Sequence, residues 1–221
     1  MTTANPDLDW RDNGTPVSIR FDDPYFSIHD GLAETCHVFL DGNRLSSRLV
    51  DGFHVAELGF GTGLNLLALA RLAEDLNVEI NFTTFEAYPL SPSDMARAHE
   101  NWPELSDQAA TMRAAYPLKG GSFSVGKVRV DLRLGIALEE LPAWHGKADA
   151  WFLDGFSPAR NPELWSETLM AEVGRHTIAG GTFATYTSAG HVRRSLTAAG
   201  FDVQKQPGFG RKREMSTGIL S

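Results

Sequence analysis

Hydrophobic and polar positions follow two different periods along the chain, and from about residue 53 strand-like and helix-like segments alternate. Alternation with period two, or a short continuous apolar run, predicts strands at 53–58, 78–85, 128–134, 148–153, 182–187, 201–205 and 215–220. Helical spacing and capping residues predict helices at 63–73, near 92–102, from 161 to the glycine pair at 180–181, and at 189–199. Strands that alternate with helices indicate an α/β fold with a mostly parallel central sheet.

The first fifty residues carry aromatic side chains and turn signals but no helical periodicity. We therefore expect an N-terminal β extension or lid at 1–52, followed by the main α/β domain at 53–221. A chain of 221 residues is long enough for one such domain with its own core and too short for two.

Composition excludes several classes of protein. No stretch reaches the roughly 18 uninterrupted apolar residues of a membrane span, and the N-terminus lacks the pattern of a secretory signal. The single cysteine, Cys36, and the seven histidines show no metal-ligand spacing, so we expect no metal and a cytoplasmic location. The net charge of -8 argues against non-specific coating of nucleic acid, although a local basic patch is compatible with it.

Three glycines at alternate positions, Gly59, Gly61 and Gly63, occupy the junction between the first predicted strand and the first predicted helix. Such a junction places a ligand over the helix N-terminus. A dinucleotide fingerprint would have its third glycine at position 64, where this chain has Leu64, so the spacing favours an S-adenosylmethionine loop in a Rossmann-like domain. A glycine turn without a ligand is the alternative. The predicted cofactor residues of this stretch are Glu57, Gly59, Phe60, Gly61, Thr62 and Gly63.

Two acidic residues lie at the ends of predicted strands, at the edge where open α/β sheets bind ligands. Glu86 is suited to accept both hydroxyls of a ribose. Asp154 is followed by Gly155 and Phe156, and we expect Asp154 to orient or deprotonate an acceptor amine and Phe156 to stack on a base. The structural alternatives are that Glu86 is a solvated acid, that Asp154 and Gly155 form a turn, and that Phe156 is a core aromatic. Ser157 and Ser188 have no evident base partner, which argues against hydrolase chemistry.

Positive charge gathers near the C-terminus of this otherwise acidic chain, with Phe209 among the cations. A patch of this kind suits a phosphate backbone, and a solubilising surface with ordinary ion pairs is the alternative. The basic residues are Arg193, Arg194, Lys205, Arg211, Lys212 and Arg213.

Seven short motifs together closely resemble the methyltransferase domain of the MnmC family of bifunctional tRNA-modification proteins. The resemblance runs from about residue 8 to the C-terminus. The motifs are PYFS at 24–27, GLAE at 31–34, VFL at 38–40, GFGTGLN at 59–65, FEAYPL at 85–90, WFLDGF at 151–156 and GFGRKREM at 208–215.

The resemblance implies a Rossmann-like class I methyltransferase that uses S-adenosylmethionine. Its implied substrate is the primary amine of 5-aminomethyl-(2-thio)uridine at wobble position 34 of tRNA, and its product is the 5-methylaminomethyl form. The loop at 59–63, Glu86 and Asp154 match the positions that border the cofactor and acceptor pocket in the family. Tyr25, Phe26 and Phe156 are candidates for holding an extruded base. Arg211, Lys212 and Arg213 are candidates for binding tRNA phosphates.

The chain departs from the family pattern in two ways. Family members continue into a flavin-dependent oxidase domain, so this chain is expected to be a stand-alone form supplied by a separate FAD oxidase activity, or else a fragment of a longer protein. Many relatives have a Gly-Asp pair where this chain has Gly135 and Ile136, and we expect adenine to be held there by backbone and apolar contacts. Two alternative functions stay open, namely another RNA or small-molecule N-methyltransferase and a non-catalytic cofactor-binding subunit.

Overall fold

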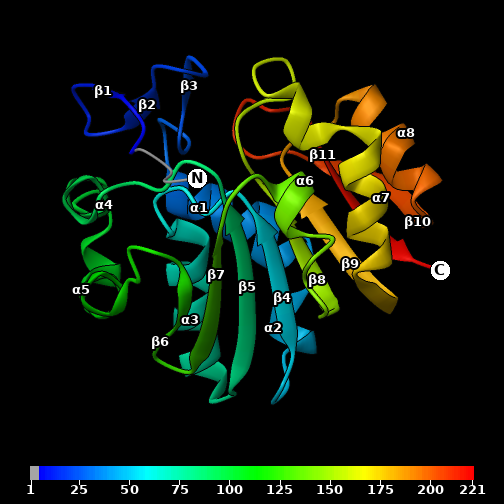
Figure 1. Ribbon diagram of the computed structural model, residues 1–221, viewed down its shortest axis with the longest axis horizontal. Helices are drawn as coiled ribbons and strands as arrows, with labels where there is room; N and C mark the ends of the chain where they lie inside the picture. The colour runs from blue at the N-terminus through cyan, green and yellow to red at the C-terminus, as the bar shows by residue number, and fades with distance from the viewer. Residues whose placement is uncertain (1–4) are drawn as a thin grey trace.

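The computed structural model describes residues 5–221 and contains a large sheet, a small sheet and the helices packed around them (Figure 1). The strands are β1 (Leu8–Trp10), β2 (Pro16–Ser18), β3 (Asp23–Pro24), β4 (His54–Leu58), β5 (Ile80–Glu86), β6 (Gly121–Val125), β7 (Val128–Leu134), β8 (Ala148–Leu153), β9 (Thr177–Thr185), β10 (Phe201–Pro207) and β11 (Glu214–Leu220). The α-helices are α1 (Gly31–Thr35), α2 (Leu45–Arg48), α3 (Leu64–Leu76), α4 (Pro92–His99), α5 (Ser106–Ala115), α6 (Ala137–Glu140), α7 (Glu167–Arg175) and α8 (Gly190–Ala198). A π-helix, η1 (Cys36–Asp41), and two 3-10 helices, η2 (Pro103–Leu105) and η3 (Pro162–Trp165), complete the described elements.

The large sheet has the strand order β10-β11-β9-β8-β4-β5-β7-β6. Its five central strands, from β9 to β7, pair in parallel, whereas β6, β10 and β11 pair antiparallel to their neighbours. Parallel strands buried on both faces need continuous apolar sequence, and β8 has five buried residues out of six. The prediction of a mostly parallel α/β sheet is confirmed.

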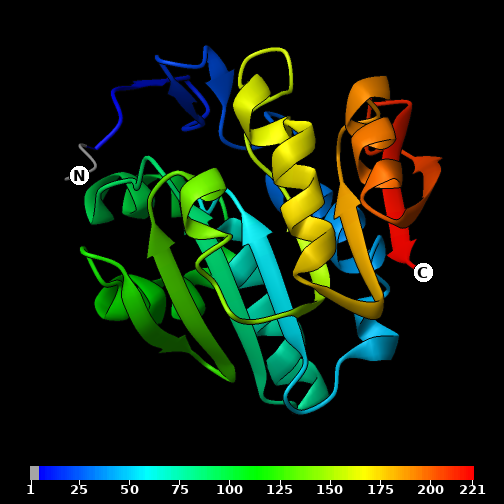
Figure 2. The ribbon, with the colours of Figure 1, turned by 45° about the vertical axis from the view of Figure 1, so that its right-hand side comes forward.

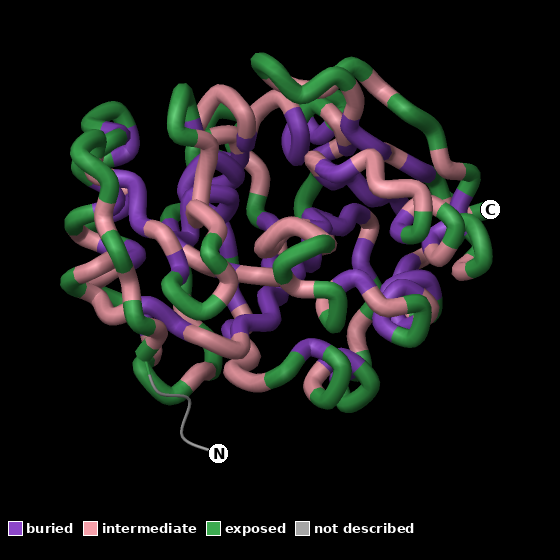
Figure 3. Tube along the Cα trace, turned by 90° about the horizontal axis from the view of Figure 1, so that it is seen from above, coloured by how far each residue is buried: buried purple, intermediate pink, exposed green. Residues whose placement is uncertain are grey.

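Helices cover both faces of the large sheet (Figure 2). One buried cluster joins residues of α3, α5 and η1 to one face, and a second cluster joins α6, α7 and α8 to the other. Eight of the thirteen residues of α3 are buried, which explains why this helix is apolar on nearly every side. Seen from above in Figure 3, the buried segments gather in the interior and the exposed segments lie on the outer loops.

The N-terminal part of the chain differs from the expected β extension. Strands β1 to β3 form a small antiparallel sheet above the ends toward which the arrows of β4 and β5 point (Figure 1). The segment from Gly31 to Arg48 is largely helical, so the prediction for 1–52 is wrong there. Asp30 begins α1 by accepting a hydrogen bond from Ala33 N (2.9 Å). The π-helix then buries three consecutive apolar residues, Val38–Leu40, and this run hides the helical period.

Two further predictions differ from the structure. The pair Gly180 and Gly181 lies inside β9 and does not end a helix, because α7 ends at Arg175 and the strand begins at once, with a register shift against β8. The segment from Pro103 to Val125, for which no element was predicted, forms η2, α5 and β6. Helix α5 has few buried residues and β6 is an edge strand, so both lack a strong apolar period.

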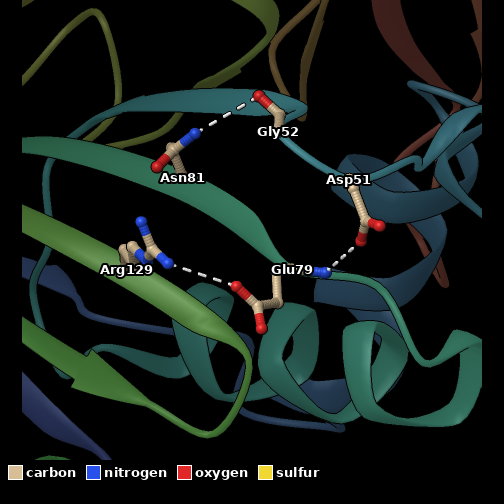
Figure 4. A network of polar contacts seen from close by, with 5 residues as sticks. All are labelled: Asp51, Gly52, Glu79, Asn81 and Arg129. Carbon is tan, nitrogen blue, oxygen red and sulfur yellow. Dashed lines mark hydrogen bonds and ion pairs between the residues drawn. The ribbon is translucent and has the colours of Figure 1, made fainter.

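A polar network connects the strand ends at the opposite side of the sheet from the arrowheads (Figure 4). Asp51 accepts a hydrogen bond from Glu79 N (2.8 Å), Asn81 donates to Gly52 O (3.2 Å), and Arg129 pairs with Glu79 (3.2 Å). The side chains of the ion pair are 74% and 62% exposed, so this pair contributes little to stability. The two hydrogen bonds between side chain and backbone hold the segment before β4 against the start of β5.

Candidate active site

A cavity of ≈ 440 Å³ opens at the carboxyl ends of β4, β5 and β8. The chain passes from β4 to β5 on one side and places β8 on the other, so the cavity lies where the strand order reverses. Open α/β sheets bind ligands at this point. The wall residues come from within five distant segments, at 23–35, 59–65, 85–88, 135–137 and 154–164, together with Phe39, Tyr186 and Lys212.

The glycine loop after β4 forms one wall of this cavity. Gly59 and Gly61 have φ values of 84° and 53°, which L side chains rarely adopt. A Cβ on Gly59 would lie 3.3 Å from the Asp154 carbonyl, and one on Gly61 would lie 3.2 Å from the ring of Tyr25. Gly63 is buried behind the wall, where its Cβ would lie 2.8 Å from the sulfur of Met112. All three glycines therefore allow close packing of neighbouring chain, and Gly59 and Gly61 also line the cavity.

The loop is supported from behind by His99, which sequence analysis did not single out as a site residue. His99 is buried, and its Nε2 lies 2.8 Å from the carbonyl of Thr62, a residue of the cavity wall. Arg113 lies 2.8 Å from Nδ1 of the same ring. Because the guanidinium can only donate, Nδ1 accepts and Nε2 donates to Thr62. Burial, with the charge of Arg113, lowers the pKa of His99, so the ring is neutral.

Glu86, at the end of β5, is buried at the edge of the cavity. Its Oε2 accepts a hydrogen bond from Gly61 N (2.8 Å) and its Oε1 accepts one from Tyr88 N (2.6 Å). Burial raises the pKa of Glu86, and these backbone bonds oppose that shift. Each carboxylate oxygen has a further lone pair, so Glu86 can still accept hydroxyl hydrogens from a ligand.

Asp154 follows β8 and lines the cavity next to the glycine loop. Its Oδ1 accepts a hydrogen bond from Gly155 N and its Oδ2 accepts one from Asn65 Nδ2, each at 2.8 Å. Burial raises the pKa of Asp154 to about 6, against the lowering effect of these two bonds. At neutral pH the carboxylate is therefore mostly ionised and ready to accept a proton or a hydrogen bond.

Glu57 does not lie on the cavity wall, although it belongs to the predicted cofactor loop. It is fully buried beneath the loop, where it accepts hydrogen bonds from Thr84 Oγ1 (2.7 Å) and Asn65 Nδ2 (2.9 Å). Burial raises the pKa of Glu57 to about 8. A neutral, enclosed carboxylic acid supports the loop from below and is out of reach of a ligand in the cavity.

Aromatic rings from two distant segments meet beside Asp154. Phe156 stacks on Phe21 with ring centroids 4.6 Å apart and meets Tyr25 edge-on at 5.0 Å. The N-terminal segment is fastened to the same loop because Asp23 Oδ2 accepts a hydrogen bond from Ser157 N (2.7 Å). Tyr25 and Phe156 line the cavity. This side of the cavity is thus built from the N-terminal segment and the loop after β8.

The remaining predicted residues divide between wall and surface. Phe26 and Phe60 line the cavity, and each also packs against an aromatic ring of the core, Trp102 and Tyr116 respectively. Gly135 lines the cavity, whereas its neighbour Ile136 is 50% exposed and lies outside the lining.

The basic C-terminal motif also divides. Lys212 lies on the cavity wall, where its Nζ pairs with Glu34 (2.8 Å) and lies 4.4 Å from the ring centroid of Tyr186. Arg211 and Arg213, on either side, are exposed on the connection between β10 and β11. Lys212 therefore contributes charge to the pocket, and its neighbours contribute charge to the surface. Glu34 belongs to the GLAE motif at 31–34, but its pairing with Lys212, far along the chain, was not predicted.

Three features of the cavity fit S-adenosylmethionine. Gly59 and Gly61 line it with main-chain atoms alone, Glu86 has lone pairs for ribose hydroxyls, and the buried hydroxyl of Tyr25 has no hydrogen-bond partner among residues 5–221. Within the same described range, no group of three or more His, Cys, Asp or Glu side chains is arranged to hold a metal ion. No helix of the described chain has the length and apolar character needed to cross a membrane.

Comparisons with known proteins agree with this geometry. A family model described as S-adenosyl-L-methionine-dependent methyltransferase matches residues 99–221, which include Asp154 but not the glycine loop. Two curated relatives are each named tRNA 5-methylaminomethyl-2-thiouridine biosynthesis bifunctional protein MnmC, and the alignments cover 96% of this chain. The identity is 45% for the Pseudomonas fluorescens protein and 46% for the Pseudomonas aeruginosa protein. The chain spans about a third of the length of these relatives (34%).

Two solved structures illustrate the fold. The crystal structure of MNMC2 from Aquifex aeolicus superposes with a TM-score of 0.76 at 25% identity and covers 99% of this chain and 71% of that chain. The precorrin-6y C5,15-methyltransferase of Geobacter metallireducens superposes with a TM-score of 0.55 at 14% identity, covering 96% of this chain and 100% of that chain. The second likeness concerns the fold alone.

Proposed function

The chain belongs to the S-adenosyl-L-methionine-dependent methyltransferase family, and from this membership we propose that it N-methylates 5-aminomethyl-(2-thio)uridine at wobble position 34 of tRNA. S-adenosylmethionine is the cofactor. The proposed product is 5-methylaminomethyl-(2-thio)uridine. The names of the two Pseudomonas relatives, at 45% and 46% identity over 96% of the chain, support this acceptor.

The observation that carries the proposal is an ionisable carboxylate beside the glycine loop, in the lining of the same cavity. Asp154 holds its charge at neutral pH, and both of its oxygens are fixed by hydrogen bonds of 2.8 Å. The residues that would hold the cofactor are the wall glycines and Glu86. When bound, S-adenosylmethionine supplies a methyl group activated by a sulfonium centre. Asp154 lies where an acceptor amine would have to be oriented.

The amine must lose a proton during the transfer. An alkylammonium has a pKa near ~10, so at neutral pH about one molecule in ~10³ is free amine, a cost of roughly 4 kcal/mol. Asp154 accepts a hydrogen bond from the amine and directs its lone pair toward the methyl group. Formation of the new N–C bond would break the methyl–sulfur bond and leave a neutral thioether as the leaving group. The nitrogen would then be cationic, and Asp154 would take or relay the proton whose loss restores the neutral amine.

The aromatic residues beside Asp154 suit an unstacked base. An enzyme that modifies a base in a tRNA loop holds it outside the stack, commonly between aromatic rings. Phe156 and Tyr25 line the cavity next to the carboxylate, and Phe26 lines it further along. We propose that Phe156 and Tyr25 hold the base and that Phe26 mainly supports them, because it also packs on Trp102.

We assign contacts with tRNA phosphates to Arg211 and Arg213. Both are exposed, and they flank Lys212, which lines the cavity. The separate FAD oxidase activity remains part of the proposal, since the named relatives are bifunctional and the chain matches a third of their length. The cytoplasm, and the division at 52–53 into an N-terminal extension and a methyltransferase domain, are likewise proposed.

Methyl incorporation from labelled S-adenosylmethionine tests the function. The substrates are one tRNA carrying 5-aminomethyl-2-thiouridine and the same tRNA carrying the carboxymethylaminomethyl form, with unmodified uridine at position 34 as the control. We expect transfer to the first tRNA only.

Other outcomes identify the alternatives. Transfer to none of the three tRNAs, with the cofactor still bound, would overturn the proposal and indicate another acceptor or a non-catalytic role. Equal transfer to all three would show that the aminomethyl group is not the acceptor.

A further inference from the structure

We infer that Asn65 is a positioning residue for Asp154: its amide, oriented by Thr35, fixes the acceptor carboxylate and joins it to Glu57 on the other side of the same group. The inference rests on the proposed function, because it concerns the residue that faces the acceptor amine. Asn65 follows the glycine loop by two residues and lies in the first turn of α3. Asn65 also lines the cavity, but its amide oxygen and both amide hydrogens are taken by protein partners, so its effect passes through Asp154.

The geometry of the amide leaves no freedom of orientation. Asn65 Oδ1 accepts a hydrogen bond from Thr35 Oγ1 (3.0 Å), and Nδ2 donates to Glu57 Oε1 (2.9 Å) and Asp154 Oδ2 (2.8 Å). Both amide hydrogens and the amide oxygen are therefore used. Turning the amide around would set its oxygen against the Asp154 carboxylate, which can only accept a hydrogen bond. The buried network, with Thr35 and Asn65 each about 5% exposed, fixes where Asp154 Oδ2 lies.

Two carboxyl groups on one amide cannot both ionise cheaply in a buried place. Glu57 is fully buried, and burial raises the pKa of Glu57 to about 8, whereas the pKa of Asp154 is about 6. At neutral pH Glu57 is the neutral member and Asp154 is the anion. The single negative charge that the amide stabilises therefore resides on the group that faces the cavity.

Other charged or titratable groups surround Asp154 without hydrogen-bonding to it in the described chain. Glu34 on α1 raises the pKa of Asp154, and Lys212 lowers it. Tyr186, after β9, donates its hydroxyl hydrogen to Gly155 O and stays neutral because burial raises its pKa well above the usual value. Asn65 is thus the only side chain among residues 5–221 that donates to this carboxylate. Its loss should free the carboxylate and raise the pKa of Asp154.

The test compares three variants. Asn65→Leu keeps a similar volume but removes the donor. Thr35→Val removes only the hydroxyl that orients the amide. Thr177→Val is the matched control, because Thr177 is also a buried threonine. Its hydroxyl donates to a backbone carbonyl, Val173 O, and it lies at the start of β9, outside the cavity lining.

Two readouts are measured from pH 5 to pH 9. The first is the carboxyl ¹³C chemical shift of Asp154, which needs no tRNA, and the second is kcat for methyl transfer. In Asn65→Leu we expect the titration of Asp154 and the rising limb of kcat to move together to higher pH by about one unit, a tenfold change in the protonation equilibrium. Thr35→Val moves both in the same direction by less. Thr177→Val lowers the melting temperature without moving either.

An Asp154 titration that stays at the wild-type pH in both Asn65→Leu and Thr35→Val would overturn the inference. If Asn65→Leu does not fold, Thr35→Val alone decides, because it keeps the amide and loses one hydroxyl. The two proposals fail separately. Absence of wild-type transfer to tRNA overturns the function, whereas wild-type transfer with an unmoved titration overturns only the role of Asn65.

Discussion

Replacing Asp154 by asparagine tests whether the acceptor side of the site needs a carboxylate. In the wild type, one oxygen accepts from Gly155 N and the other from Asn65 Nδ2, each at 2.8 Å. Asparagine has one oxygen and one NH₂ group, so in either orientation its NH₂ group faces one of these donors. Asp154→Asn therefore loses the ionised acceptor and also sets a donor against a donor.

The size of the effect follows from these two losses. A positioned proton acceptor contributes about 10²- to 10⁴-fold to a rate, and an unmade buried hydrogen bond costs about 1–3 kcal/mol. We expect kcat to fall by at least about 100-fold, which is about 2.7 kcal/mol of transition-state stabilisation. The dissociation constant of S-adenosylmethionine should change by less than about threefold, because Glu86 is held by Gly61 and Tyr88 and shares no bond with Asp154.

Single-turnover transfer of labelled methyl groups gives the rate, and titration calorimetry gives the cofactor affinity. Asp22→Asn is the control, since it makes the same substitution at an exposed aspartate. Asp22 pairs with Arg160 at 2.8 Å, and the two side chains are 72% and 52% exposed. A rate for Asp154→Asn within threefold of the wild type would refute the reasoning. A loss of cofactor affinity as large as the loss of rate would assign Asp154 to cofactor binding.

Three further predictions concern the cofactor wall, the buried acid and the basic surface. Gly61→Ala places a Cβ 3.2 Å from Tyr25 at a φ of 53°, so calorimetry should show about tenfold weaker cofactor binding, and unchanged binding would contradict the close-approach role. Glu57 has a folded pKa of about 8 against a usual 4.5, so wild-type stability falls as pH rises from 4.5 to 8; Glu57→Gln, which does not titrate, should gain on the wild type by on the order of 3 to 5 kcal/mol between pH 4.5 and pH 9 in urea unfolding, and a constant difference would show that Glu57 is ionised in the fold. Replacing Arg211 and Arg213 by alanine should weaken tRNA binding and reduce the slope of log K against log salt by about 2, with cofactor affinity unchanged; an unaltered slope would assign both residues to structure.

The sequence was sufficient for the centre of the sheet. The ranges 128–134 and 148–153 match β7 and β8, because alternation and continuous apolar runs are strong signals where one or both faces are buried. The helical segment from Gly31 to Arg48 escaped prediction, since three consecutive buried residues in a π-helix follow no single period. The helix end expected at Gly180 was wrong because glycine also occurs in strands that shift register.

The site was predictable where one residue type carries the chemistry at a strand end. The wall glycines, Glu86, Asp154 and Phe156 meet in one cavity, and each follows a predicted strand. Contacts across the fold were out of reach: Thr35 and Asn65 are separated by 30 residues, and Asn65 and Asp154 by 89. Sequence could not show that Glu57 lies beneath the cavity, because this depends on what packs on its face of β4. It could not show that Lys212 faces the cavity, because this depends on the path of the connection between β10 and β11.

The fastening of the N-terminal segment to the acceptor loop has a consequence for the order of folding. The bond between Gly61 and Glu86 closes 25 residues of chain, whereas the bond between Asp23 and Ser157 closes 134. Closing the longer loop costs about 1.5 kcal/mol more in chain entropy, and it must wait for most of the sheet. We therefore expect the contact between Gly61 and Glu86 to form before the N-terminal segment is fastened to the loop after β8.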